Sequence, residues 1–198
     1  MGNFNLPFLD KTKEFVAGFI GENFSEKICY HNIDHTLEVV EASEMIGHQY
    51  KISDVDMETL LIAAWFHDTG YYLGCQNHEE ASAKIAQKFL QSHNIDSNII
   101  KQVTNCILST KLPQKPTTLL EKILCDADLF HLSSEHFLKK SQLLLHEISL
   151  RTGEISQKKW MMDTLDFISA HTYHTEYCQR KLGPLQKKNV DLLLSKVD

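Results

Sequence analysis

The sequence has few residues that break helices and few that could crosslink the chain. Only 8 of its 198 residues are glycine and 4 are proline, which favours long helices and excludes a fibrous, collagen-like chain. The cysteines are odd in number and never form a Cys-x-x-Cys pair: Cys29, Cys75, Cys106, Cys125 and Cys178. This pattern is typical of reduced thiols rather than of a disulfide framework or a zinc ribbon.

The sequence also lacks a long hydrophobic run and an excess of positive charge. Its longest strongly apolar run, residues 60–66, is far shorter than the roughly 20 residues that span a bilayer. The first twenty residues lack the apolar core of a signal peptide. The net charge of -6 argues against a broad nucleic-acid surface, which needs a basic face. We predict a cytoplasmic protein without a membrane partner; a small anionic substrate stays compatible with this charge.

Apolar residues recur at three- and four-residue steps along most of the chain, as in amphipathic helices, and we find no repeat and no convincing strand pattern. With 198 residues the chain fits one domain, 1–198. The predicted fold is an all-α, irregular orthogonal helical bundle. Its predicted helices cover residues 7–24, 32–50, 57–66, 78–91, 97–108, 117–132, 135–150, 156–172 and 175–195, the last with a break at Gly183-Pro184. Asn32, Ser53 and Asn77 stand where side chains cap helix starts.

One stretch, Ala63-Ala64-Trp65-Phe66-His67-Asp68-Thr69-Gly70, joins an apolar helix to an adjacent imidazole and carboxylate. The run 60–66 has no polar face, and a helix that is apolar all round lies in the middle of its domain. We therefore expect His67 and Asp68 to emerge from the core at a rigid helix end.

Other histidines and carboxylates could complete a metal site with this pair. Upstream, His31 and His35 are four residues apart, and downstream Asp126 and Asp128 lie in an apolar background. A divalent cation needs a preorganised cluster of imidazole and carboxylate ligands with open positions for water and substrate. His35, His67, Asp68 and Asp128 could supply such a cluster from three helices. Each residue alone also fits a surface, capping or pairing role.

The order His35, His67-Asp68, Asp128 resembles the HD superfamily of metal-dependent phosphohydrolases, whose pattern is H…HD…D, over roughly residues 30–131. The resemblance implies that His35, His67, Asp68 and Asp128 bind a divalent metal, and it selects Asp128 over Asp126 as the last ligand. Asp126 would then orient a ligand or its water from behind. If a second ion binds, Asp68 is expected to bridge, with His78 as the plausible added ligand and His93 a surface residue.

The segment Tyr30-His31-Asn32-Ile33-Asp34-His35 is similar to a motif of cyclic-nucleotide phosphodiesterases, a distant branch of the same superfamily. The similarity implies that His31 is the general acid that protonates the leaving oxygen while His35 holds the metal. Residues four apart share a helix face, which is compatible with these roles. The alternative is that His31 only hydrogen-bonds near the start of its helix.

The resemblance therefore implies a catalytic phosphohydrolase, with His31 and Asp68 at the reacting centre. Its substrate would be a phosphoester or phosphoanhydride of a nucleotide or similar small phosphorylated metabolite. The cofactor would be Mn²⁺, Mg²⁺, Fe²⁺, Ni²⁺ or Zn²⁺, all of which accept mixed His/Asp ligands. Lys111 is a candidate contact for a substrate phosphate, with Arg180 and Lys181 as alternatives. The segment 107–111 lacks the histidine that many relatives carry, which favours one metal over two.

Three other functions fit parts of the sequence. A non-catalytic, nucleotide-sensing regulatory domain would keep the bundle and the metal, and an oxygenase would use the same scaffold for other chemistry. A helical protein-interaction module would need no metal, so chelation would leave its thermal stability unchanged. The substrate and the oligomeric state do not follow from the sequence.

Overall fold

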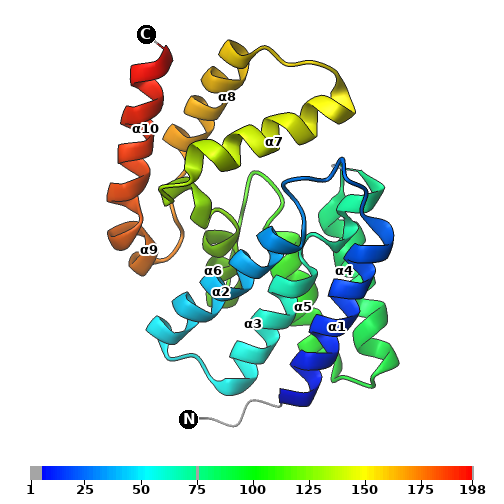
Figure 1. Cartoon of the computed structure of the whole chain (residues 1–198). Helices are drawn as coiled ribbons and strands as arrows, with labels where there is room; N and C mark the ends of the chain where they lie inside the picture. The colour runs from blue at the N-terminus through cyan, green and yellow to red at the C-terminus, as the bar shows by residue number, and fades with distance from the viewer. Residues whose placement is uncertain (1–5, 75, 198) are drawn as a thin grey trace.

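The protein is all-α, as predicted. The structure, a computed structural model, describes residues 6–74 and 76–197, and within them the chain forms helices and no strand. The α-helices are α1 (Leu6–Asn23), α2 (Ile33–Tyr50), α3 (Asp54–Phe66), α4 (His78–Ser92), α5 (Ser97–Ser109), α6 (Leu119–Asp128), α7 (Phe137–Thr152), α8 (Gln157–Ala170), α9 (Glu176–Lys181) and α10 (Gly183–Val197). Two short 3-10 helices follow the ends of α3 and α6, η1 (Thr69–Leu73) and η2 (Phe130–Ser133). The helices cross at varied angles, so the bundle is irregular (Figure 1).

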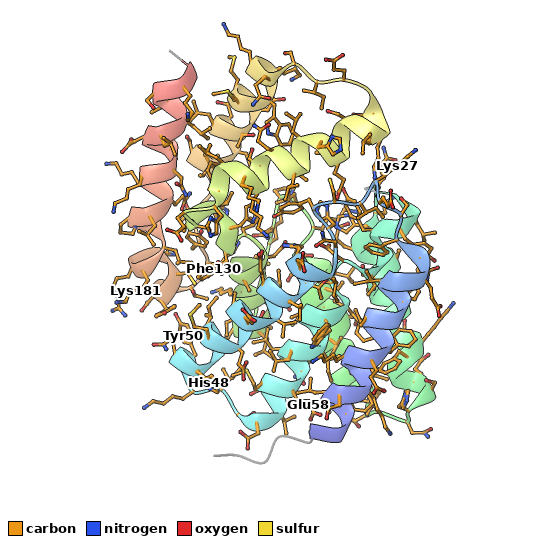
Figure 2. All side chains as sticks on the ribbon, in the orientation of Figure 1. Lys27, His48, Tyr50, Glu58, Phe130 and Lys181 are labelled. Atoms are coloured by element: carbon orange, nitrogen blue, oxygen red, sulfur yellow. The ribbon has the colours of Figure 1, made fainter. Side chains whose placement is uncertain are left out.

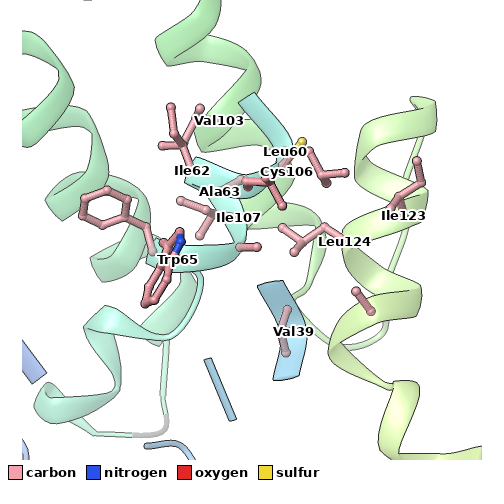
Figure 3. Close-up of a cluster of buried hydrophobic side chains, with 14 of the residues drawn as sticks. Val39, Leu60, Ile62, Ala63, Trp65, Val103, Cys106, Ile107, Ile123 and Leu124 are labelled. Atoms are coloured by element: carbon pink, nitrogen blue, oxygen red, sulfur yellow. The ribbon is translucent and has the colours of Figure 1, made fainter. Parts of the chain in front are cut away.

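Helix α3 is the centre of the helical bundle, by which we mean α1 to α6. Every residue from Leu60 to Phe66 is buried, and α3 packs against α1, α2 and α5. Burying one large aliphatic side chain contributes roughly 1.5–3 kcal/mol, so this run anchors the helix firmly. Figure 3 shows the side chains that converge on it from α2, α5 and α6: Val39, Val103, Cys106, Ile107, Ile123 and Leu124. The C-terminal end of α3 is therefore held in place by the core.

Side-chain caps determine where three bundle helices begin. Asn32 Oδ1 accepts hydrogen bonds from the backbone N–H groups of Asp34 (3.0 Å) and His35 (3.2 Å). Ser53 caps α3 in the same way through Asp56 N–H, and Thr118 forms a reciprocal capping box with Glu121 at the start of α6. Such caps are worth about 1 kcal/mol each. The cap on α2 also fixes the backbone that carries His35.

Two local expectations need correction. Helix α6 was expected to run to about residue 132, but it ends at Asp128, where the chain tightens into η2. Asn77 does precede α4, but its predicted side-chain cap is wrong because the residue has a left-handed backbone, with φ 56°. Its Oδ1 instead accepts a hydrogen bond from Lys111 Nζ at 3.0 Å. The expected break before α10 falls at Leu182.

A second group of helices, α7, α8 and α10, lies over one end of the bundle, and we call it the C-terminal layer (Figure 1). It has a small apolar cluster of its own, formed with η2, whose buried members are Leu129, Leu132, Phe137, Ile168 and Leu193. Long side chains connect α7 to the bundle. One of them, Lys140, forms an ion pair with Glu38 of α2 at 2.6 Å.

Two further observations concern the cysteines and the apolar character of the helices. Four cysteines form no disulfide: Cys29, Cys106, Cys125 and Cys178. Cys75 lies outside the described residues. In the described part of the chain, no helix combines the length and the apolar character that a membrane span requires.

Candidate metal centre

Three helix ends deliver the four predicted ligands to one place. His35 is on the first turn of α2, His67 and Asp68 directly follow α3, and Asp128 is the last residue of α6. His35 and His67 are almost completely buried, whereas Asp128 keeps about a fifth of its side chain exposed (19%). Because each helix is anchored in the bundle core, the side chains start from rigid positions.

The donor atoms of these residues converge closely. His35 Nε2 and His67 Nε2 are 3.4 Å apart, and Asp128 Oδ1 lies 3.3 Å from the first and 3.7 Å from the second. One donor atom from each of these three residues lies within 4.8 Å of the others. Asp68 Oδ2 completes the group at 3.1 Å from His67 Nε2 and 3.5 Å from His35 Nε2.

Two features indicate that this arrangement fits a divalent cation. His67 Nδ1 donates a hydrogen bond to the carbonyl oxygen of Ala64 at 2.7 Å, so in the neutral ring the lone pair lies on Nε2, which faces the cluster. Asp68 Oδ2 is buried without a hydrogen bond of acceptable geometry, although a buried carboxylate oxygen normally has a partner. Two imidazole nitrogens and two carboxylate oxygens form a donor set that many divalent metals accept.

The electrostatics of the cluster favour positive charge. Burial alone would lower the pKa of His67, but the carboxylates of Asp68 and Asp128 outweigh it and raise that pKa to about 9. Burial would raise the pKa of Asp68, yet His67 keeps it well below its ordinary value. The carboxylates of Asp68 and Asp128 therefore favour a positive charge beside His67 Nε2. A divalent cation bound there would replace the proton of that imidazole.

The other oxygen of Asp68 faces α4. Its Oδ1 lies 3.4 Å from His78 Nε2, which is also 3.5 Å from Glu79 Oε1. The turn that follows Asp68 packs closely on α4, and Gly70 N–H donates to Ser82 Oγ at 2.8 Å. A Cβ atom on Gly70 would lie 2.3 Å from the carbonyl oxygen of His78. His78 thus contacts the Asp68 oxygen that does not face His35 and His67.

His31 lies next to the cluster and is held by a residue that the sequence analysis missed, Glu147 of α7. The His31 Nδ1 atom is 2.5 Å from Glu147 Oε1, and the backbone N–H groups of Tyr30 and His31 donate to Glu147 Oε2. Glu147 is fully buried. Burial would raise its pKa, but these hydrogen bonds lower it, so the carboxylate stays ionised.

Aromatic stacking holds the same imidazole from its face. The His31 ring stacks on Tyr71 with centroids 3.9 Å apart and planes at 19°. The guanidinium of Arg151 lies 4.4 Å from the centre of the Tyr71 ring. Glu147 and Arg151 are one turn apart on α7, so a single helix of the C-terminal layer positions this ring both directly and through Tyr71.

Several predicted residues lie outside the cluster. Asp126 accepts hydrogen bonds from the N–H groups of His174 (2.7 Å) and Thr175 (2.9 Å) and from the Thr175 hydroxyl; these contacts tie α6 to the start of α9. Lys111 pairs with Glu80. His93 packs on Phe89, while Arg180 and Lys181 are exposed on α9.

The fold and the cluster define an all-α protein with a mixed histidine and aspartate metal-type site. The family model of the HD domain matches residues 32–133, which include all four predicted ligands. The chain therefore belongs to the HD domain family. This agrees with the predicted motif region of about 30–131 and supports a metal-dependent hydrolase.

A solved structure is similar over most of the chain. It is the crystal structure of a predicted HD superfamily hydrolase from an uncultured Thermotogales bacterium, with a TM-score of 0.59 and 21% identity. The match covers 93% of this chain and 88% of that one. At this identity it shows the shared fold alone. No curated protein sequence matches the chain.

Proposed function

We propose that this protein is a metal-dependent phosphohydrolase that acts on a phosphoester or phosphoanhydride of a nucleotide or similar small phosphorylated metabolite. The observation that carries the proposal is the convergence of His35, His67, Asp68 and Asp128, with a buried Asp68 oxygen that lacks a hydrogen bond. These four residues are the proposed ligands. A divalent cation held there would neutralise charge on phosphoryl oxygens and lower the pKa of attacking water.

His31 is the proposed general acid. Hydrolysis breaks the bond between phosphorus and the leaving oxygen, forms a bond from phosphorus to the water oxygen, and leaves the departing oxygen in need of a proton. The His31 imidazolium can donate that proton from Nε2, because Glu147 occupies Nδ1. The fixed ring lies 5.8 Å from the His35 ring, centroid to centroid, which places it next to the proposed ligands. A positioned acid of this kind contributes roughly 10²–10⁴-fold to the rate.

We also propose that residues 1–198 act as one domain. The support is that the proposed general acid is in the bundle while its carboxylate partner is on α7 of the C-terminal layer. The two regions would then form one site rather than two independent units.

A substrate panel with matched histidine variants tests the proposal. Release of phosphate or nucleoside would be measured from mono-, di-, tri- and cyclic nucleotides with added Mn²⁺ or Mg²⁺, together with the metal content of the purified protein. His35→Ala should abolish both metal binding and activity. His48→Ala is the control, because His48 is on the same helix but its side chain is exposed and pairs with Glu44, away from the cluster.

Two results would contradict the proposal. If the folded wild-type protein binds no metal, the four proposed ligands do not form a metal site and the proposal fails. A metal-loaded wild type that hydrolyses none of these compounds would favour the sensing domain instead.

A further inference from the structure

A cavity of about 410 Å³ opens beside the proposed metal site, within the range of roughly 300–1,000 Å³ that is usual for small-molecule sites. Two proposed ligands, His35 and Asp128, form part of its wall. The rest comes from α2, from the end of α6, from η2 and the segment that follows it, and from the first turn of α7. Figure 2 labels Phe130, one of the lining residues, between α2 and the C-terminal layer.

One side of the cavity is apolar. Val39, Ala42 and Met45 of α2 lie at three- and four-residue steps beyond His35, so they share its face of the helix. Ala127 and Phe130 line the cavity from the end of α6 and the start of η2. The surface beside the metal ligands is therefore suited to an organic group rather than to a string of phosphates.

The polar part of the lining mixes imidazoles and one serine with more carboxylates than lysines or arginines; its histidines and serine are His35, His131, His136 and Ser134. Glu38 and Glu41 of α2 line the cavity, and Lys140 is the one lysine or arginine among the described residues that do so. Lys140 Nζ lies 2.6 Å and 2.7 Å from the two carboxylate oxygens of Glu38, so its charge is already balanced. Glu41 adds a negative charge, and the described part of the lining holds no second lysine or arginine to pair with it.

This charge distribution separates substrates by their number of phosphate groups. A single phosphoryl group at the metal site would be neutralised there. A second or third phosphate in the cavity would meet the carboxylates of Glu38 and Glu41 with no free lysine, and juxtaposed like charges are strongly unfavourable. Hydroxyl groups would find acceptors in the same carboxylates.

We propose that this cavity holds the organic part of a phosphate monoester, an uncharged hydroxyl-bearing group of nucleoside size, and that Glu38 and Glu41 determine this specificity. The inference rests on the proposed phosphohydrolase function and narrows its substrate class. The apolar wall contacts the flat or carbon-rich part of the group, and the two glutamates exclude nucleoside di- and triphosphates.

Charge reversal at one position of the cavity tests the proposal. We would measure kcat/KM for the mono-, di- and triphosphate of one nucleoside in the wild type, in Glu41→Lys and in Glu44→Lys. Glu44 is the matched control because it is exposed on the same helix but does not line the cavity. The wild type should prefer the monophosphate by about tenfold or more, since a single like-charge contact commonly costs more than 1.4 kcal/mol.

The Glu41→Lys variant should lower KM for the triphosphate and reduce the preference for the monophosphate, whereas Glu44→Lys should keep the wild-type ratio. Glu38→Gln should act in the same direction as Glu41→Lys, because it releases Lys140. A wild type that prefers the triphosphate, or a Glu44→Lys variant that changes the ratio as much as Glu41→Lys, would overturn the inference.

A generic monoester separates this inference from the proposed function. If p-nitrophenyl phosphate is hydrolysed in a metal-dependent way but nucleotides show no preference for one phosphate, only the specificity proposal fails. If neither p-nitrophenyl phosphate nor any nucleotide is hydrolysed by the metal-loaded protein, both fail.

Discussion

The helical bundle and the C-terminal layer differ in what they bury and in what they bring to the candidate site. Among the described residues, the apolar core of the bundle extends through α1 to α6, whereas that of the layer has five buried members. All four proposed ligands come from the bundle. The layer supplies Glu147 to His31 and Lys140 to the cavity. The proposed metal ligands and the carboxylate that positions the proposed general acid are thus in different parts of the molecule, so variants in the two regions should fail in different ways.

The largest effect should follow from loss of a ligand in the bundle. Asp68→Ala should lose the metal and reduce kcat/KM by about a thousandfold or more, because the cation supplies several kcal/mol of charge stabilisation. A chelator should lower the melting temperature of the wild type but not of Asp68→Ala, since only a protein that binds metal is stabilised by it. The control is Asp163→Ala, an exposed site on α8. A variant that retains full metal content would contradict the proposed ligand set.

A variant in the C-terminal layer should separate catalysis from metal binding. Glu147→Gln should keep the wild-type metal content and reduce kcat by about 100-fold, the lower end expected for a disabled general acid. Combining it with His31→Ala should add little, because both changes remove the same proton donor. Glu154→Gln, exposed just beyond α7, is the matched control. Loss of metal from Glu147→Gln would show that the two regions are not separable.

Asp126 and Asp128 of α6, two residues apart, offer a sharper comparison. Asp126→Asn should lower the free energy of unfolding by roughly 1–3 kcal/mol, because buried hydrogen bonds to residues 174 and 175 lose a charged acceptor. Its metal content should stay that of the wild type. Asp128→Asn should instead lose the metal, while its free energy of unfolding, measured for both proteins in the presence of a chelator, should stay that of the wild type. Denaturant unfolding and metal analysis of both variants would decide this, and metal loss from Asp126→Asn would restore Asp126 as a candidate for the site.

The smallest effect is expected at Lys111, the predicted phosphate contact. Its ammonium pairs with Glu80 at the surface, so Lys111→Ala should leave kcat and KM at their wild-type values in the same substrate panel. An increase in KM for the best substrate would instead reinstate Lys111 as a substrate contact.

Local signals in the sequence were sufficient for most of the fold. The apolar run that ends at His67-Asp68 indicated a buried helix, and Asn32 and Ser53 do cap their helices. A buried helix and its cap depend on residues that are close in sequence, so the spacing of apolar and capping residues predicts them well. The prediction that the Asn77 side chain caps α4 was wrong. The residue type alone does not determine the backbone conformation at this position, and the observed conformation directs the side chain towards Lys111.

The candidate site was only partly predictable. The order of histidines and aspartates led us to four residues that the structure brings together, and their role as ligands stays a prediction. Glu147 escaped notice because it is separated from His31 by 116 residues and lies in an ordinary-looking amphipathic helix. A glutamate with no exposed surface is recognisable only once the packing of α7 is known.

Gly70 controls how closely the turn that carries Asp68 approaches the start of α4, which carries His78. The turn after α3 approaches the start of α4 so closely that an added Cβ atom would collide with backbone and side-chain atoms. The spacing between this turn and the start of α4 is therefore limited by contact between their main-chain atoms. A single methyl group at position 70 would push this turn away from the start of α4. It would thereby change the spacing between Asp68 and His78 without altering any atom of either residue.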